Sequence, residues 1–286
     1  MKSRRCILFC VVFGFMSMGF AADTKFITIP DSTYKRKDNS GNTQTITVSS
    51  FQIADSLVTV KEWKYFLNDL YPLSISDWQS RMQYLTDSDY KEMSISDNWP
   101  TFILTWYQVV EYCNWRSIKD GLKPVYTYAK NKKGLFDTCN WDKNANGYRL
   151  PTEAEWELSS GIVTAYATEK DYILNTWVPL KIDIHGTPHD IKQKTPNRFG
   201  LYDAFGIVSQ YCWDYYDERY FLSKEVINPS GPTKAYASNG DHLEHVLRVA
   251  RGSWWTTTAH EIVTQPRFYG YAEANNQGIG FRLAKN

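Results

Sequence analysis

Two stretches near the start of the chain alternate apolar and polar residues, as half-buried β-strands do. The first is KFITIP, residues 25–30, and the second is TQTITVSSFQIADSLVTV, residues 43–60. Between them, residues 31–42 are polar and end in the turn-forming pair Gly41-Asn42. We therefore expect strands in both stretches, joined by a polar hairpin loop over residues 31–42.

At Thr59 the pattern changes from strand to helix. Thr59 is followed three residues later by Glu62, and this arrangement is a capping box, in which the two residues satisfy each other's backbone N–H groups. The same box recurs at Thr105–Gln108 and at Thr152–Glu155. The boxes predict helices over residues 61–70, 107–121 and 153–161. Strands followed by three helices with the same kind of N-terminus indicate one α+β core.

After Gly161 the chain loses its periodicity. Residues 179–200 and 228–246 are rich in turn-forming residues, and loops this long in a compact domain are functional or specifically stabilised. The last such segment lies between the Arg251-Gly252 pair and the Gly280-Phe281-Arg282 block, and it also shows neither helical nor strand spacing. No linker marks a boundary, so we expect a single domain over residues 22–286.

The N-terminus has the composition of a signal peptide. Lys2, Arg4 and Arg5 precede an apolar stretch over residues 7–20, which is short for a transmembrane helix. Gly19 and Ala21 occupy the −3 and −1 positions of a signal-peptidase site. We therefore predict cleavage after Ala21, export to the periplasm or cell surface, and no transmembrane segment in the mature chain.

Charge and cysteine content exclude several classes of function. The 32 basic and 31 acidic residues give a formal net charge of +1, and loss of the three basic residues of the leader makes the mature chain slightly acidic. Binding to nucleic acid is therefore not expected. Cys113, Cys139 and Cys212 remain after cleavage. They allow one disulfide with one free thiol, or three buried thiols, and their wide spacing does not fit a zinc site.

Several blocks resemble the formylglycine-generating enzyme (sulfatase-modifying factor) family. They include NGYRLPTEAEWE at residues 146–157, NRFGLYDAFGIVSQYCWDYY at 197–216, and the pair RGSWW and GIGFRLA within 251–284. The resemblance implies a C-type-lectin-like α+β fold with little regular secondary structure. Within the first block, Arg149 is expected to form a buried ion pair with Glu155 or Glu157.

The same resemblance argues against the family's oxidase chemistry. The oxidase holds copper on a pair of cysteines in the C-terminal loop, whereas here Thr256, Thr257 and Thr258 stand near the first position and no cysteine follows Cys212. The histidines, which occur in the pairs His185/His189 and His242/His245, do not suggest the three-histidine iron site of a related branch. The calcium turn of the family is replaced by Gly206-Ile207-Val208-Ser209-Gln210. We therefore expect no catalytic residue, no metal and no cofactor.

What remains is the C-terminal loop over about 254–278, whose Tyr, Trp, Thr and Asn content is similar to that of an antibody paratope. It also resembles the variable proteins of diversity-generating retroelements, which display a diversified region on a lectin-like fold. The predicted ligand-binding residues are Trp254, Thr256, Thr257, Thr258, His260, Gln265, Phe268, Tyr269, Tyr271, Asn275, Asn276 and Gln277. Trp255 is excluded as a buried aromatic.

Three hypotheses follow for the function. The first is an exported, non-catalytic protein whose loop binds an unknown protein or glycan, with or without diversification. The second is a fixed structural or accessory protein of the envelope, and the third is a sulfatase-modifying-type oxidoreductase. The composition of the loop favours the first.

Overall fold

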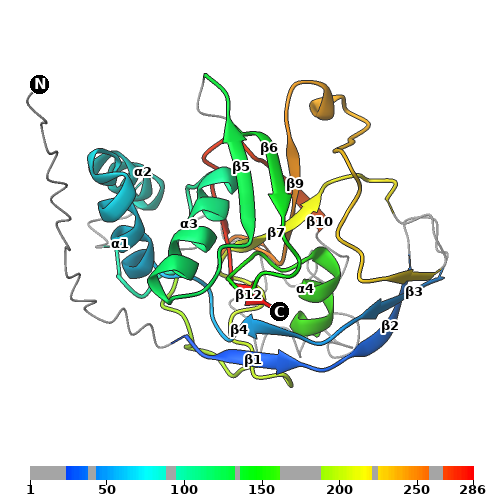
Figure 1. The fold of residues 1–286 in the computed structure, drawn as a ribbon. Coiled ribbons are helices and arrows are strands. Elements are labelled where there is room, and N and C mark those ends of the chain that lie inside the picture. Colours follow the sequence, from blue (N-terminus) through cyan, green and yellow to red (C-terminus); the bar gives the residue numbers. More distant parts are fainter. Residues whose placement is uncertain are drawn as a thin grey trace, which may run out of the picture.

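The computed structural model describes residues 24–37, 43–87, 95–132, 136–161, 188–220, 225–257 and 267–286. Within these ranges the helices are α1 (Val60–Leu70), α2 (Ile75–Asp87), α3 (Trp106–Lys119) and α4 (Glu153–Ser160), with the 3-10 turns η1 (Pro72–Ser74) and η2 (Asp241–Leu243). Figure 1 shows α1, α2 and α3 together on one side of the molecule, whereas α4 lies between the central strands and the N-terminal strands. None of the described helices is long and apolar enough to cross a membrane.

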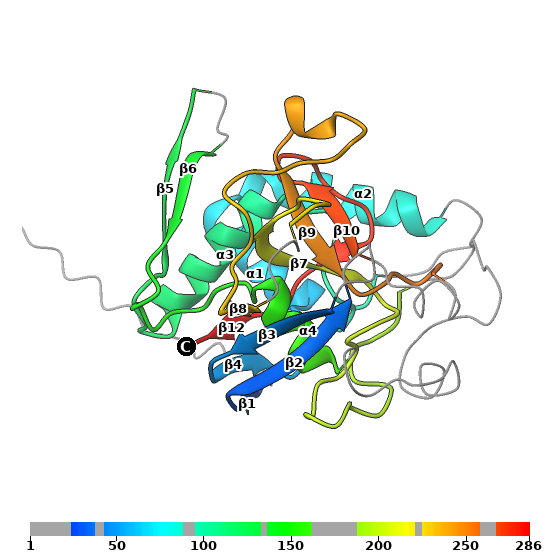
Figure 2. The ribbon, with the colours of Figure 1, turned by 90° about the vertical axis from the view of Figure 1, so that its right-hand side faces the viewer.

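The strands form several small sheets. One sheet has the order β1 (Phe26–Ile29), β4 (Phe51–Ala54), β12 (Ala284–Lys285), and another has the order β2 (Ser32–Lys37), β3 (Thr43–Val48), β8 (Glu225–Ile227). The central sheet has the order β10 (Arg267–Tyr271), β9 (Leu247–Arg251), β7 (Ser209–Tyr215), β11 (Ile279–Gly280). A separate hairpin consists of β5 (Tyr126–Lys130) and β6 (Phe136–Trp141). Figure 2 shows β10 beside β9 at the edge of the central sheet.

The two ends of the described chain are joined through β4. Phe26 pairs with Ala54 on one edge of this strand, and Ala284 pairs with Ile53 on the other. Arg149 and Ala284 also exchange two backbone hydrogen bonds, of 2.8 and 2.7 Å. The C-terminal residues therefore complete a sheet that begins at the N-terminus, which places the last loop between two parts of one fold.

The predicted helix starts are confirmed. Thr59, Thr105 and Thr152 each accept a hydrogen bond from the backbone N–H three residues on, and the side chain at that third position returns a bond to the cap. The predicted pair in the NGYRLP block is also present. The Arg149 guanidinium donates to both oxygens of Glu155, at 2.6 and 2.8 Å, and both side chains are almost fully buried. The capping box and this ion pair use the same carboxylate, because Glu155 Oε2 also accepts the Thr152 N–H at 2.8 Å.

The predicted polar loop over residues 31–42 is wrong in its first half. Ser32–Lys37 forms strand β2, which pairs antiparallel with β3 from Ser32↔Val48 to Lys37↔Thr43. The Tyr34 hydroxyl donates to Glu157 at 2.7 Å and the Arg36 guanidinium donates to the same oxygen at 2.6 Å. The inward residues of this strand are thus polar, and their partners lie more than a hundred residues away.

Two elements were not predicted from the sequence, and one expectation needs correction. Residues 75–87 form helix α2, and residues 126–141 contain the β5–β6 hairpin, neither of which the periodicity indicated. In addition, the C-terminal segment is not entirely a loop, because Arg267–Tyr271 forms strand β10. Gly270 interrupts the apolar pattern of β10. A side chain at this position would meet the Tyr211 hydroxyl at 2.6 Å, so close packing against Tyr211 excludes anything larger than glycine.

Aromatic rings dominate the main core. Trp63 and Phe66 of α1 contact Tyr112 of α3, and the ring of Phe281 lies 5.8 Å from Trp63 and 5.2 Å from Tyr112. Aromatic pairs in such offset and edge-on arrangements stabilise the fold by more than the burial of their apolar area alone. Phe281 therefore fixes the C-terminal block of the chain to the helices.

Candidate functional site

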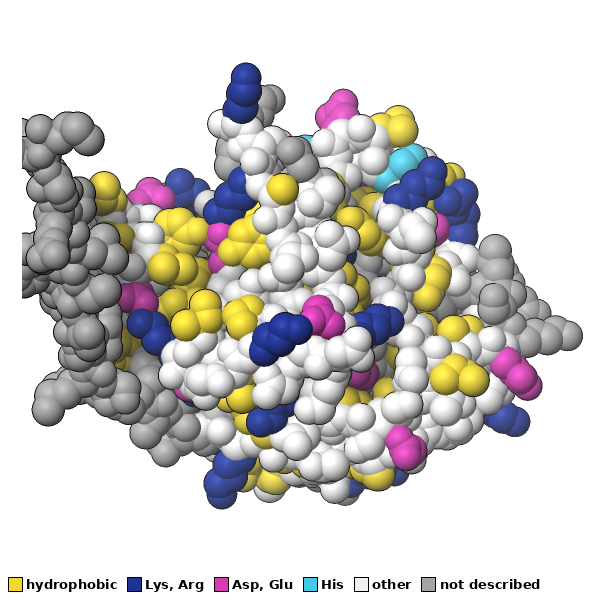
Figure 3. Space-filling view, in the orientation of Figure 1, with side chains coloured by type: hydrophobic (Ala, Val, Ile, Leu, Met, Phe, Trp, Pro, Cys, Tyr) yellow, Lys and Arg dark blue, Asp and Glu magenta, His cyan; other side chains and the backbone are white. Residues whose placement is uncertain are grey.

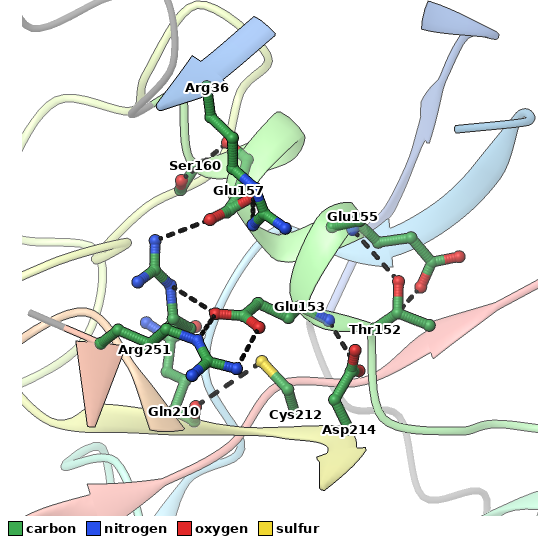
Figure 4. A network of polar contacts seen from close by, with 12 residues as sticks. Arg36, Thr152, Glu153, Glu155, Glu157, Ser160, Gln210, Cys212, Asp214 and Arg251 are labelled. Carbon is green, nitrogen blue, oxygen red and sulfur yellow. Dashed lines mark hydrogen bonds and ion pairs between the residues drawn. The ribbon is translucent and has the colours of Figure 1, made fainter. Parts of the chain in front are cut away.

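Two arginines, one just before the predicted loop and one within it, are held against helix α4 by largely buried ion pairs. Arg251 ends β9, and its Nη2 donates to Glu157 Oε1 at 3.0 Å, while its Nε lies 3.7 Å from Glu153 Oε1. Arg267 begins β10 and donates to the two oxygens of Glu153 at 2.7 and 3.0 Å. Figure 4 shows Glu153 and Glu157 extending from α4 towards Arg251. One short helix thus anchors the end of β9, just before the predicted loop, and the start of β10 within it.

The carboxyl groups of this cluster differ in their partners, because Glu153 and Glu157 bond to arginines whereas Asp214 does not. Burial by itself raises the pKa of Glu153, but the positive charges of Arg267 and Arg251 outweigh it, so that the pKa is lowered and the carboxylate stays ionised. Asp214 lies beside it and accepts the backbone N–H of Glu153 at 2.8 Å. Burial, together with the negative charge of Glu153, raises the pKa of Asp214 to about 8. Asp214 is therefore mostly protonated at neutral pH.

Beyond the clamp, two of the predicted tyrosines converge on one carboxylate. The hydroxyls of Tyr269 and Tyr271 donate to Asp241 Oδ2 at 2.6 and 3.0 Å. The Asn239 side-chain amide donates to the same oxygen at 3.0 Å. These hydrogen bonds, first from Tyr269 and then from Tyr271, lower the pKa of Asp241. The two tyrosines stand on one face of β10, two residues apart, as strand geometry requires.

More rings extend this surface on both sides. The Tyr216 ring lies 4.8 Å from Tyr269, and the His245 ring lies 4.6 Å from Tyr271. His245 in turn forms a hydrogen bond to the Glu273 carboxylate. We call Tyr216, Asp241, His245, Tyr269 and Tyr271 the tyrosine surface. Its rings are partly exposed and held in place by hydrogen bonds, which are the properties of a rigid contact surface.

Trp254 and Thr257 belong to a turn rather than to this surface. The Thr257 N–H donates to the Trp254 carbonyl at 2.9 Å, and the Trp254 N–H donates to Thr257 Oγ1 at 3.3 Å. Thr257 is buried and Thr256 half-buried. Trp254 packs so closely on Gly278 that a side chain there would lie 2.1 Å from the indole. Trp255 is buried against Phe102, which agrees with its exclusion from the site.

The predicted residues of the last turn differ in their roles. Asn275 and Gln277 are exposed. Asn276, which lies between them, has its side chain bonded to the backbone of Tyr271. Its amide donates to the Tyr271 carbonyl at 2.7 Å, and its Oδ1 accepts the Tyr271 N–H at 3.2 Å. Phe268 is 43% exposed on the opposite face of β10 from the tyrosines. Thr258, His260 and Gln265 lie outside the described residues.

Four residues that the structure brings to the tyrosine surface or its hydrogen bonds were not predicted from the sequence. Asn239, Asp241 and His245 come from the polar segment 228–246, and Tyr216 ends the NRFG block. The available signal was the Asn239-Gly240-Asp241 turn in a segment already expected to be functional or specifically stabilised. Its proximity to β10 is tertiary information, because 28 residues separate Asp241 from Tyr269.

Two residues at the positions compared with the family's calcium turn make contacts within the protein. Ile207 is fully buried, and the Gln210 side chain accepts hydrogen bonds from Trp156 at 2.9 Å and from Arg282 at 2.6 Å. Within the described ranges, no group of three His, Cys, Asp or Glu side chains is placed to hold a metal. Cys113, Cys139 and Cys212 are free thiols. Burial raises the pKa of Cys139 to about 12, so at neutral pH this thiol is not a nucleophile.

Residues 10–286 match the family described as "Sulfatase-modifying factor enzyme 1-like domain". The chain belongs to this family. The match extends over nearly the whole sequence and confirms the resemblance that the sequence blocks indicated.

Two relatives in this family are similar over most of their length. The "Chaperone protein LppX" of Paenibacillus barcinonensis is 26% identical and covers 91% of this chain and 89% of its own. The "Inactive C-alpha-formylglycine-generating enzyme 2" of Mus musculus is 23% identical over 95% of this chain and 89% of its own. Among solved structures, "Treponema denticola variable protein 1" superposes with a TM-score of 0.68 at 24% identity, covering 92% of this chain and 95% of that one. The superposition confirms the α+β, C-type-lectin-like fold.

Proposed function

We propose that this protein is an exported, non-catalytic binding protein that presents its C-terminal segment, about 254–278, to a macromolecular ligand. The observation that carries the proposal is the clamp on α4. Arg251 at the end of β9 and Arg267 at the start of β10 bond to Glu157 and Glu153, so the strand that carries Tyr269 and Tyr271 is held rigidly against α4. The tyrosine surface next to the clamp offers rigid aromatic area with hydrogen-bonding groups.

The chemistry of the segment supports binding over catalysis. It contains no cysteine, and the last thiol of the chain, Cys212, is fully buried with its pKa raised mainly by that burial. The hydrogen bonds to Asp241 raise the pKa of Tyr269 and of Tyr271 and lower the pKa of Asp241, so the tyrosines stay protonated and the carboxylate is a weak base. A relative that carries the word "inactive" in its name shows that the family includes such members.

The proposal is tested by capture from envelope extracts. The double variant Tyr269→Ala/Tyr271→Ala removes the two central rings, and we expect it to lose most of the ligand captured by the wild-type protein. Leu73→Ala is the matched control, since Leu73 is a large apolar residue that is 96% exposed on η1. Equal capture by the wild-type protein and the double variant would exclude the tyrosine surface as the binding site.

Diversification of the segment is a separate part of the proposal. It is supported by the Tyr-, Thr- and Asn-rich composition and by a fold shared with a protein named a variable protein. Sequencing codons 250–284 from many independent isolates tests it. Changes concentrated at adenine-containing codons of the segment are expected, whereas a segment as invariant as Asn146–Glu157 would rule diversification out.

One alternative has an observation of its own in favour. The relative named a chaperone matches over 91% of this chain, which supports a fixed accessory protein acting on other envelope proteins. This alternative predicts an invariant segment and a single partner. The oxidoreductase hypothesis predicts copper-dependent oxidation of a cysteine-containing peptide, and an assay that detects such oxidation would replace the binding proposal.

A further inference from the structure

The hydrogen bonds of β10 show which of its residues face away from β9. In an antiparallel pair, residues alternate between positions bonded to the neighbour and positions directed outward. The Ala272 N–H donates to the Val246 carbonyl at 2.8 Å, so with the register Tyr271↔Leu247 the residues bonded to β9 are Phe268, Gly270 and Ala272. The backbone N–H and C=O of Tyr269 and Tyr271 therefore point towards the outer edge of the sheet.

At Tyr271 this edge is already satisfied by a side chain. The Asn276 carboxamide accepts the Tyr271 N–H at 3.2 Å and donates to the Tyr271 carbonyl at 2.7 Å. These are the two bonds that a residue of a neighbouring strand would make. Asn276 is held in turn by its own backbone, which pairs with Leu104. The Asn276 side chain therefore occupies the outer edge of β10 at Tyr271.

At Tyr269 the edge is open. Among the described residues, no hydrogen bond reaches the outward N–H or C=O of Tyr269. Edge strands are commonly protected by charged side chains, as at β2, where Lys35 is exposed. The one charged residue of β10 is Arg267, whose guanidinium is bonded to Glu153. The outer edge of β10 at Tyr269 therefore lacks the exposed charged side chain that protects the edge of β2.

We propose that an extended segment of a partner polypeptide adds to the outer edge of β10 and pairs its backbone with Tyr269. The inference rests on the proposed function and specifies its ligand as a protein. Strand addition supplies affinity through main-chain bonds and selectivity through alternate side chains. Here the selective contacts come from Phe268 on one face, and from Tyr269 and Tyr271 on the other.

Two substitutions at one position separate backbone pairing from side-chain contact. Tyr269→Ala removes the ring and keeps the N–H, whereas Tyr269→Pro removes both. Proline is tolerated where the lost N–H faces away from the sheet, so Tyr269→Pro leaves the β9–β10 bonds in place. A displayed library of random 12-residue peptides is selected on the wild-type protein, and the enriched peptides are measured on both variants.

We expect the enriched peptides to bind Tyr269→Pro at least about tenfold more weakly than Tyr269→Ala, since a main-chain hydrogen bond and the close approach of the partner strand are both lost. Equal binding to the two variants would overturn strand addition while leaving the tyrosine surface as the site. Enriched peptides that are indifferent to both variants would overturn the proposed site as well. Failure to enrich any peptide would overturn a polypeptide ligand.

A measurement on the wild-type protein covers the case in which Tyr269→Pro does not fold. In amide hydrogen exchange, the Tyr269 N–H is expected to exchange fast in the free protein and to gain at least tenfold protection when an enriched peptide is bound. Unchanged exchange at Tyr269 in the complex contradicts the proposal. Sedimentation of the protein without peptide tests the remaining occupant, because a dimer abolished by Tyr269→Pro would assign the edge to a second copy of the chain.

Discussion

Asp214 and Glu153 lie side by side in the same buried cluster and yet carry different charges. Glu153 faces two guanidinium groups and is ionised, whereas Asp214 accepts a single backbone N–H from Glu153 and keeps its proton. The difference follows from the cost of burying an unpaired charge, which neutralises a carboxyl that has no cation of its own. The same principle acts at Arg282, where burial lowers the pKa to about 10. At the residue scale, the partners in the fold therefore decide what each titratable side chain does.

We predict that Asp214 makes the protein less stable as pH rises. Its pKa is raised from 3.8 to about 8 in the folded protein, so between these values the unfolded chain releases a proton that the folded chain retains. The free energy of unfolding should decline from pH 4 to pH 8, and Asp214→Asn should flatten that decline. Urea unfolding at pH 4, 6 and 8 measures it. Asp142→Asn, at an exposed carboxylate paired with Lys123, is the control, and parallel curves for Asp214→Asn and the wild-type protein would contradict the assignment.

A second prediction at this scale concerns Gly278. Its φ is 71°, and a Cβ there would lie 2.1 Å from the Trp254 ring, so Gly278→Ala should cost about 3 kcal/mol through strain and displacement of Trp254. Gly121→Ala is a matched control with the same φ of 71° and open space around it, and should cost about 1 kcal/mol. Urea unfolding followed by tryptophan fluorescence compares them. Equal costs would mean that the indole moves aside freely.

At the scale of elements, helix α4 connects parts of the chain that are distant in sequence. Its eight residues begin at a capping box and carry Glu153, Glu155 and Glu157, which bond to Arg267, Arg149 and Arg251. The capping box made the helix predictable from sequence, because it is local chemistry. The partners of its carboxylates were not predictable in the same way, and only Arg149 was expected, since it lies in the same block.

We predict that Glu153→Gln destabilises the protein by about 3 kcal/mol, because it leaves the buried guanidinium of Arg267 without its carboxylate. The exposed pair Lys64–Asp97 provides the control, and Asp97→Asn should change stability by less than about 1 kcal/mol. Thermal unfolding measures both variants. A Glu153→Gln protein as stable as the wild type would show that this ion pair does not stabilise the attachment of β10 to α4.

At the scale of the whole molecule, the closing strand β12 holds the first and last described segments together. It pairs with β4, while Arg149 and Ala284 exchange backbone bonds next to the Arg149–Asn286 hydrogen bonds of 3.0 and 2.9 Å. The C-terminal segment therefore lies between β9 and the closing block, and through β10 it contributes a strand to the central sheet. Its exposed residues, such as Asn275 and Gln277, are the ones that can vary with little effect on the core.

We predict that deletion of residues 284–286 destabilises the protein by at least about 2 kcal/mol, because backbone pairing to β4 and to Arg149 is lost at buried positions. Removal of residues 1–21, the predicted signal peptide, should leave the melting temperature unchanged. Thermal unfolding of the two shortened chains compares them. A large loss on removal of residues 1–21 would contradict the predicted start of the domain.

The sequence by itself determined the features whose chemistry is local: the three capping boxes, a buried pair between Arg149 and either Glu155 or Glu157, and the family to which that block belongs. It did not reveal strand β2, because the inward-facing Tyr34 and Arg36 are polar. Their inward position is explained by hydrogen bonds to Glu157, which is distant in the sequence. The tyrosine surface was predictable only in part, since Tyr269 and Tyr271 were expected to bind ligand from the sequence whereas Asp241 was not. Only the tertiary structure decided that Asp241 accepts hydrogen bonds from those hydroxyls and that, within the described ranges, no hydrogen bond reaches the outer edge of β10 at Tyr269. Hydrogen bonds between distant segments leave no local pattern in a sequence, whereas a capping box is a short motif of fixed spacing.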